Sequence, residues 1–226
     1  MKIMNIQKLA LVSSDLQAQQ VFYAKVLELP AELNASGLIV KTGGTELVFS
    51  QAPAGFTGAY HFAFNIPSNQ FEPARQWISA RKPLLRDAGG KEVFHSGTWD
   101  SDSVYFLDAA GNVLEFIARY TLQNPMEGEF DSRMILNVSE IGLPSEDVVG
   151  MASELGSKLG LATYKQEANE NFTPVGDENG LLILPKVERI WMPDSGVPAR
   201  MLPVHVWGQA GGRLWEVRGV PYEIAG

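Results

Sequence analysis

The sequence contains no cysteine and only three histidines among its 226 residues. The absence of cysteine excludes disulfide bonds, thiolate nucleophiles and cysteine metal ligands, so any metal site must use histidine, aspartate or glutamate. Basic clusters are also absent, and the formal net charge is −8. A chain of this charge repels the phosphate backbone of nucleic acids on average, so we expect no nucleic-acid binding.

Long hydrophobic runs are missing as well. No stretch of eighteen consecutive apolar residues occurs, so the sequence predicts no membrane-spanning helix. The N-terminal segment, MKIMNIQKLALVSSDL, lacks the apolar core and the small-residue cleavage site of a signal peptide, and we therefore expect a cytoplasmic protein. With 45% hydrophobic and 19% charged residues, the composition is typical of a globular chain with one large core or two small ones.

Three segments of the chain open with the same pattern, which is an apolar strand, a polar cap and an amphipathic helix. These segments begin at Lys8, His61 and Glu140. Each helix is followed by short apolar stretches that are separated by glycine turns, as expected for further strands. The pattern therefore predicts an α+β fold built from repeated βαβββ modules.

The modules divide the chain into three parts. We expect residues 1–55 and 56–120 to pair into a half-barrel, whose concave face is large enough for a small ligand. Residues 121–133 are polar, contain proline and glycine, and are typical of a linker. Residues 134–226 then form a third module with an extra C-terminal strand. Because this third module has no partner in the chain, we expect a homodimer.

His61 and Glu115 are polar side chains within two otherwise apolar strands. Alternation along residues 61–66 places His61 on the face opposite Phe62. Alternation along residues 113–119 likewise places Glu115 opposite the apolar face that meets the helix. We expect both side chains to point into the concavity, with Tyr105 on the neighbouring strand.

Several phrases of the sequence resemble the vicinal oxygen chelate superfamily, namely LALVSSDLQAQQVFYAKVLEL, HFAFNIP and VYFLDAAGNVLEF. This superfamily includes glyoxalase I, the extradiol ring-cleaving dioxygenases, fosfomycin-resistance thiol transferases and bleomycin-binding proteins. The resemblance covers residues 5–120 well and residues 134–226 weakly. It implies the paired βαβββ fold and a small, oxygen-rich organic molecule as ligand.

The resemblance also implies where a metal would bind. In metal-using members the ligands come from the first and last strands of the modules, and in the second module these positions fall on His61 and Glu115. In the first module they fall on Lys8 and Val48. A divalent ion such as Fe, Mn, Zn or Ni would then have an incomplete ligand set, because the lysine ammonium occupies the third ligand position.

Three functions stay open at this point, and the third is a dimeric scaffold whose cavity is filled by side chains. In the first, His61 and Glu115 hold a divalent metal, and Tyr105 or Lys8 supplies a proton or hydrogen bond to a reacting oxygen, as in a lyase or a ring-cleaving dioxygenase. In the second, the protein binds a drug-like or aromatic molecule without metal, as bleomycin-resistance proteins do, with Trp99 and Tyr105 lining the cavity. The lysine at the third position argues against a standard three-ligand dioxygenase site.

Glu140 and His205 offer a second acid and imidazole pair in the third module. Because a single module cannot close a barrel, we expect a structural role for both residues. Each of the other candidates also has an ordinary interpretation, such as a hydrogen-bonded strand-edge histidine for His61 or a solvated strand-end lysine for Lys8.

Overall fold

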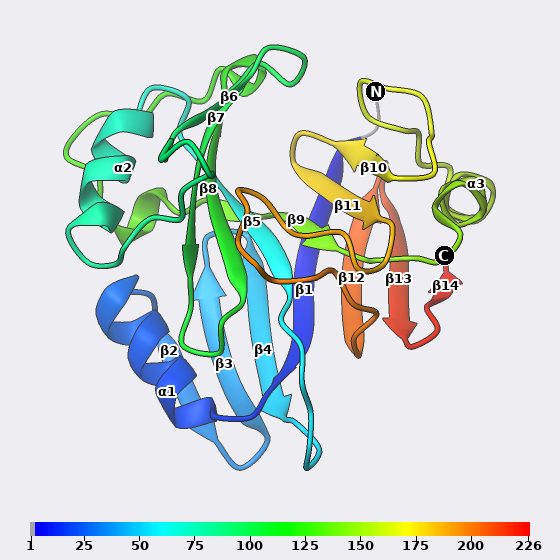
Figure 1. The fold of residues 1–226 in the computed structure, drawn as a ribbon, viewed down its shortest axis with the longest axis horizontal. Helices are drawn as coiled ribbons and strands as arrows, with labels where there is room; N and C mark the ends of the chain where they lie inside the picture. Colours follow the sequence, from blue (N-terminus) through cyan, green and yellow to red (C-terminus); the bar gives the residue numbers. More distant parts are fainter. Residues whose placement is uncertain (1–2) are drawn as a thin grey trace.

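The computed structural model describes residues 3–226 and contains two seven-stranded sheets (Figure 1). Sheet A has the strand order β14-β13-β12-β1-β4-β3-β2, and its strands are Met4–Ser13 (β1), Ala31–Asn34 (β2), Gly37–Thr42 (β3), Thr45–Gln51 (β4), Val204–Ala210 (β12), Arg213–Gly219 (β13) and Glu223–Ala225 (β14). Sheet B has the order β10-β11-β9-β5-β8-β7-β6, and its strands are His61–Ile66 (β5), Phe94–Ser96 (β6), Ser101–Leu107 (β7), Val113–Arg119 (β8), Asn137–Gly142 (β9), Phe172–Asp177 (β10) and Gly180–Pro185 (β11).

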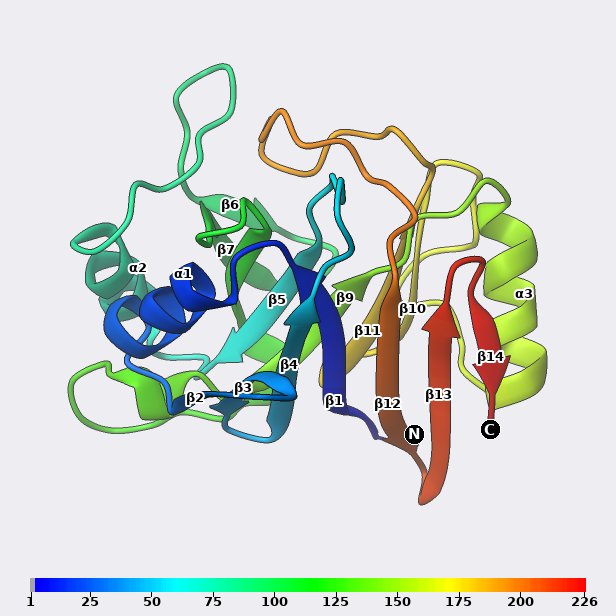
Figure 2. The same cartoon turned by 90° about the horizontal axis from the view of Figure 1, so that it is seen from below.

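The helices lie at the two ends of these sheets. Helices α1 and α2 are at one end and α3 is at the other (Figures 1 and 2). Their bounds are Leu16–Val21 (α1, continued by a π-helical turn at Phe22–Val26), Phe71–Ser79 (α2) and Val148–Leu159 (α3), with single 3₁₀ turns at Tyr120–Leu122 and Ser132–Met134. Within residues 3–226, no helix has the length and apolar character needed to cross a membrane.

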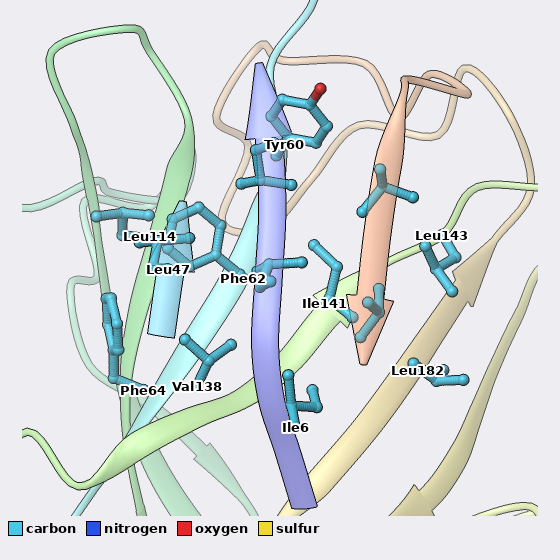
Figure 3. Close-up of a cluster of buried hydrophobic side chains, with 14 of the residues drawn as sticks. Ile6, Leu47, Tyr60, Phe62, Phe64, Leu114, Val138, Ile141, Leu143 and Leu182 are labelled. Carbon is cyan, nitrogen blue, oxygen red and sulfur yellow. The ribbon is translucent and has the colours of Figure 1, made fainter. Parts of the chain in front are cut away.

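The main apolar core lies between the two sheets. Alternation along each strand sends one set of side chains to this core, and Ile6 of β1, Leu47 of β4, Phe62 of β5 and Ile141 of β9 gather there (Figure 3). All four are 1% exposed or less. The opposite face of sheet B is concave, and it has a separate, smaller cluster of buried aromatic and aliphatic side chains.

The predicted fold class is confirmed, because the chain is α+β with repeated βαβββ modules and sheet B forms a half-barrel. The partners within the half-barrel differ from our expectation. Strand β5 of the second module pairs antiparallel with β9 of the third, whereas β1 of the first module pairs with β12. The second and third modules therefore share sheet B, and the first module shares sheet A with the last three strands.

This pairing removes the reason for which we expected a homodimer, because the third module has its partner within the chain. The homodimer stays a prediction.

The two sheets follow the same plan around one central strand. Strand β1 pairs in parallel with β4 and antiparallel with β12, as β5 does with β8 and β9. On β1, Ala10 lies opposite Val48 on one side and His205 on the other. On β5, Ala63 occupies the corresponding place.

A buried carboxylate, Asp108, connects the turn before β8 to helix α1. It accepts hydrogen bonds from the backbone N–H groups of Ala110 and Asn112, both at 2.9 Å, and from the Asn112 side-chain amide at 2.7 Å. The Gln19 amide donates to it at 2.7 Å, and the Tyr23 hydroxyl at 3.2 Å. The Asp108 side chain therefore holds the first module against the second.

We predict that Asp108→Ala lowers the free energy of unfolding by about 3 kcal/mol or more, because it leaves several buried donors without a partner. The matched control is Asp87→Ala. Asp87 closes a similar turn through the N–H groups of Gly89 and Lys91, but on the exposed surface, so its loss should be about 1 kcal/mol or less. Urea unfolding followed by circular dichroism measures both, and equal losses would contradict the assignment.

Candidate metal and ligand site

Four neighbouring strands of sheet B bring a row of side chains together on its concave face. Ala63 on β5 lies opposite Glu115 on β8 and opposite Glu140 on β9. Tyr105 on β7 lies opposite Glu115 on its other side. His61 is two residues before Ala63 and therefore shares its face. Because Ala63 contributes only a methyl group, the two flanking carboxylates face a common space.

A β-bulge turns Glu140 into this row. Phe64 pairs with Val138 and Ala63 pairs with Glu140, so Ser139 is an extra residue on β9. Strict alternation would place Val138 and Glu140 on the same face. The bulge instead leaves Val138 in the main core and turns Glu140 to the concave face, an effect that bulges beside functional sites commonly have.

The ligand atoms of His61, Glu115 and Glu140 all lie within 4.8 Å of one another. The closest contact between imidazole and carboxylate joins His61 Nε2 to Glu115 Oε2 at 3.6 Å, which is too long for a hydrogen bond. The Nδ1 of His61 lies 3.0 Å from the backbone carbonyl of Val113. Since a carbonyl can only accept, Nδ1 carries the proton of the neutral ring and the Nε2 lone pair faces the cluster.

Burial sets the charge of these groups. It lowers the pKa of His61 to about 4, so the imidazole is neutral over most of the pH range. Burial, together with the neighbouring charge of Glu140, raises the pKa of Glu115 to about 8, although Ser103, Arg119 and Tyr105 act in the opposite direction. Burial also raises the pKa of Glu140, and Arg119 opposes this shift.

Arg119 lies four residues beyond Glu115 on β8, on the same face of the strand, and is fully buried. It donates a hydrogen bond to a carboxylate oxygen of Glu140 and another to Asn65 Oδ1 at 3.2 Å. Its guanidinium also lies 5.3 Å from the ring centroid of Trp99. Among the described residues, one arginine therefore forms an ion pair with one of the two buried carboxylates, and Glu115 has no such arginine or lysine partner.

A cavity of about 340 Å³ opens above the cluster. This size is within the range of small-molecule sites. Its walls are mostly aromatic and aliphatic, and they come from His61, Phe94, His95, Ser96, Trp99, Ser101, Ser103, Tyr105, Glu115, Ile117, Glu140, Phe172, Ile183, Arg189, Ile190, Trp191 and Met192. The Trp191 ring lies over the imidazole of His61 with 4.7 Å between the ring centroids.

Trp191 belongs to the long segment between β11 and β12, which extends beyond the ends of the strands (Figure 2). Residues 188–199 of this segment form a turn that we call the capping hairpin. Its two arms are joined by backbone hydrogen bonds from Glu188 to Ala199 at 2.8 Å, from Ala199 to Arg189 at 2.8 Å and from Trp191 to Val197 at 3.0 Å. The hairpin therefore presents its side chains to the cavity from a fixed backbone.

Of the residues singled out in the sequence, the structure brings His61, Glu115 and Tyr105 together and places Lys8 elsewhere. Lys8 lies on β1 in sheet A, its side chain is 40% exposed, and its ammonium pairs with Glu46 at 2.9 Å. Lys8 does not line the cavity. The expectation that it occupies the third ligand position is corrected, because β1 pairs with β12 and not with β5.

We expected only a structural role for Glu140, but its carboxylate joins the cluster of His61 and Glu115. Its place in the repeat was visible in the sequence, but the pairing of β9 with β5 was not. His205, its companion in our expectation, lies in sheet A and contacts Glu216 at 2.8 Å. Trp191 and Arg189 were missed altogether, since no periodic pattern identifies the side chains of an irregular segment.

No protein-family model matches the chain, and no curated protein matches it either. Among solved structures, a proposed dioxygenase from Bacillus subtilis subsp. subtilis strain 168 is similar over 94% of this chain and 68% of its own, with 16% identity and a TM-score of 0.58. A lactoylglutathione lyase from Agrobacterium tumefaciens is similar over 50% of this chain and 91% of its own, with 24% identity and a TM-score of 0.41.

The first of these similarities extends over nearly the whole chain. At such low identity it concerns the fold and not the chemistry. It shows that this chain shares the fold of that structure, in agreement with the repeated βαβββ modules expected from the sequence.

Proposed function

We propose that the chain binds a divalent metal ion through His61, Glu115 and Glu140 and uses it to bind and transform a small, oxygen-rich organic molecule. The observation that carries this proposal is the buried cluster of two carboxylates and an imidazole lone pair below a ligand-sized cavity. Glyoxalase-like and ring-cleaving dioxygenase chemistry both agree with this arrangement.

The cluster matches a divalent ion in its donor set and in its charge. Imidazole nitrogen and carboxylate oxygen together suit Fe, Mn, Zn and Ni, whereas Mg and Ca prefer oxygen alone. Two carboxylates buried side by side repel each other, and only Glu140 has an arginine partner. A cation between them would offset this repulsion and the cost of burial.

The metal ion, Tyr105 and Trp191 would have separate roles in the site. A divalent ion held by His61, Glu115 and Glu140 would supply Lewis acidity toward the oxygens of a bound ligand. Burial, together with the charges of Glu115 and Glu140, raises the pKa of Tyr105 well above its usual value, so its phenol stays protonated. It can therefore donate a hydrogen bond to an oxygen that gains negative charge in the reaction. The Trp191 ring covers His61 and keeps water away from it.

A second function is the metal-free binding of an aromatic or drug-like molecule. It is favoured by the aromatic walls of the cavity and by the existing bond between Arg119 and Glu140. A protonated Glu115 would need no cation in that case. His61 and Glu115 would then serve only as polar anchors for the ligand.

Removal of His61 separates the two functions. We predict that His61→Ala lowers the affinity for Mn²⁺ by at least about 100-fold, since loss of an outer-shell partner alone can cost 10- to 100-fold. Isothermal titration with Mn²⁺ and elemental analysis of protein purified without chelators measure this. The matched control is His205→Ala, which removes an imidazole from sheet A and should leave metal content unchanged.

Metal-free wild-type protein that still binds an aromatic ligand would favour the second function. Glu140→Gln extends the test to the third ligand. It should weaken Mn²⁺ binding as strongly as Glu115→Gln does, whereas Lys8→Ala should have no effect.

Stability should also depend on pH in the metal-free protein. The pKa of Glu115 is about 8 in the folded state, compared with a usual value of 4.5. The stability due to its proton is therefore complete below pH 4.5 and is lost as pH rises through 8. We predict a loss approaching about 1.4 kcal/mol per pH unit between roughly pH 6.5 and 7.5.

Urea unfolding in the presence of EDTA measures this slope. Glu115→Gln should flatten it, and saturating Mn²⁺ should remove it from the wild-type protein. A wild-type slope that the Gln variant retains in full would contradict the assignment to Glu115.

A further inference from the structure

Arg189 is a cation at the cavity wall without an acidic partner. No carboxylate lies within 4.0 Å of its side-chain nitrogens in the part of the chain that the structure describes. Its guanidinium carbon instead lies 4.6 Å from the ring centroid of Phe172, which also lines the cavity. Arg200, the residue that follows the capping hairpin, differs because it pairs with Glu188 at 3.4 Å.

The capping hairpin holds Arg189 in a defined place relative to the metal cluster. The Arg189 carbonyl accepts a hydrogen bond from Ala199 at 2.8 Å. Two residues further along, the Trp191 ring lies over His61. The same short arm therefore contacts the cluster through Trp191 and borders the cavity through Arg189, so a ligand in the cavity can reach a free guanidinium.

The charges of the cavity favour a negatively charged ligand. In the metal-loaded site, the two positive charges of the ion cancel those of Glu115 and Glu140, so Arg119 leaves one positive charge in excess. Arg189 adds a second. Because a guanidinium offers several N–H donors in one plane, it matches a carboxylate or a similar planar anion particularly well.

We propose that Arg189 binds the anionic group of the ligand, so that the natural ligand is a flat aromatic molecule with a carboxylate or a similar anion. The ring would lie among the aromatic side chains Trp99, Tyr105, Phe172 and Trp191. This inference rests on the proposed function, in that the cavity must bind a small molecule. It makes Arg189 a specificity-determining residue of that site.

The test compares two probes of nearly equal shape, 3-phenylpropanoate and its uncharged amide, 3-phenylpropanamide. Isothermal titration of the full chain loaded with Mn²⁺ measures both affinities at low salt and at 0.3 M salt. We expect the carboxylate to bind about tenfold tighter than the amide, the gain from one hydrogen-bonded charge pair. This preference should shrink at high salt, since Arg189 is open to solvent.

Arg189→Gln should abolish the preference, because neither probe then meets a cation at the cavity wall, and circular dichroism checks that the variant is folded. Arg200→Gln is the matched control, since it removes a charge next to the capping hairpin but not from the cavity wall, and it should keep the preference. Equal affinities in the wild type, no binding of either probe, or a preference that survives Arg189→Gln would each overturn the inference. The metal content of the protein is measured separately. Bound metal without a preference for the carboxylate would overturn only the inference on Arg189, whereas protein that binds no metal would overturn the proposed function.

Discussion

Two carboxylates buried on either side of a single methyl group are the constraint on which the site depends. Glu115 and Glu140 flank Ala63 on the concave face of sheet B, where both are at least nine-tenths buried. Removal of such groups from water is costly unless a cation or a proton accompanies them. Arg119 compensates one of them, and the other must bind a proton or a metal. The chemistry of the cavity follows from that requirement.

Much of this site could be predicted from the sequence because it depends on local pattern. The alternation of apolar and polar residues identifies which face of a strand His61 and Glu115 occupy, and the repeat identifies the modules. The third carboxylate could not be predicted in the same way. It depends on the pairing of β9 with β5 and on a bulge at Ser139, and both arise from contacts between segments far apart in the chain.

The error over Lys8 has the same origin. Lys8 and His61 occupy corresponding places in their modules, each two residues before the central alanine, Ala10 or Ala63. The internal alignment of the repeats was therefore sound. The pattern did not show which modules share a sheet, because that depends on pairing between β1 and β12 and between β5 and β9, which lie far apart in the chain. The capping hairpin belongs to none of the repeated strands and helices, so the repeat could not predict its position.

The shared plan of the two sheets has a consequence for how the molecule can change over time. Around Ala10 the flanking places hold Val48 and His205, whereas around Ala63 they hold two acids. Sheet B thus carries two buried acids around its central alanine, whereas the matching places in sheet A carry an aliphatic side chain and a part-exposed imidazole. A substitution at Val48 or His205 therefore leaves the buried acids of sheet B untouched, whereas one at Glu115 or Glu140 alters the charge of the cluster.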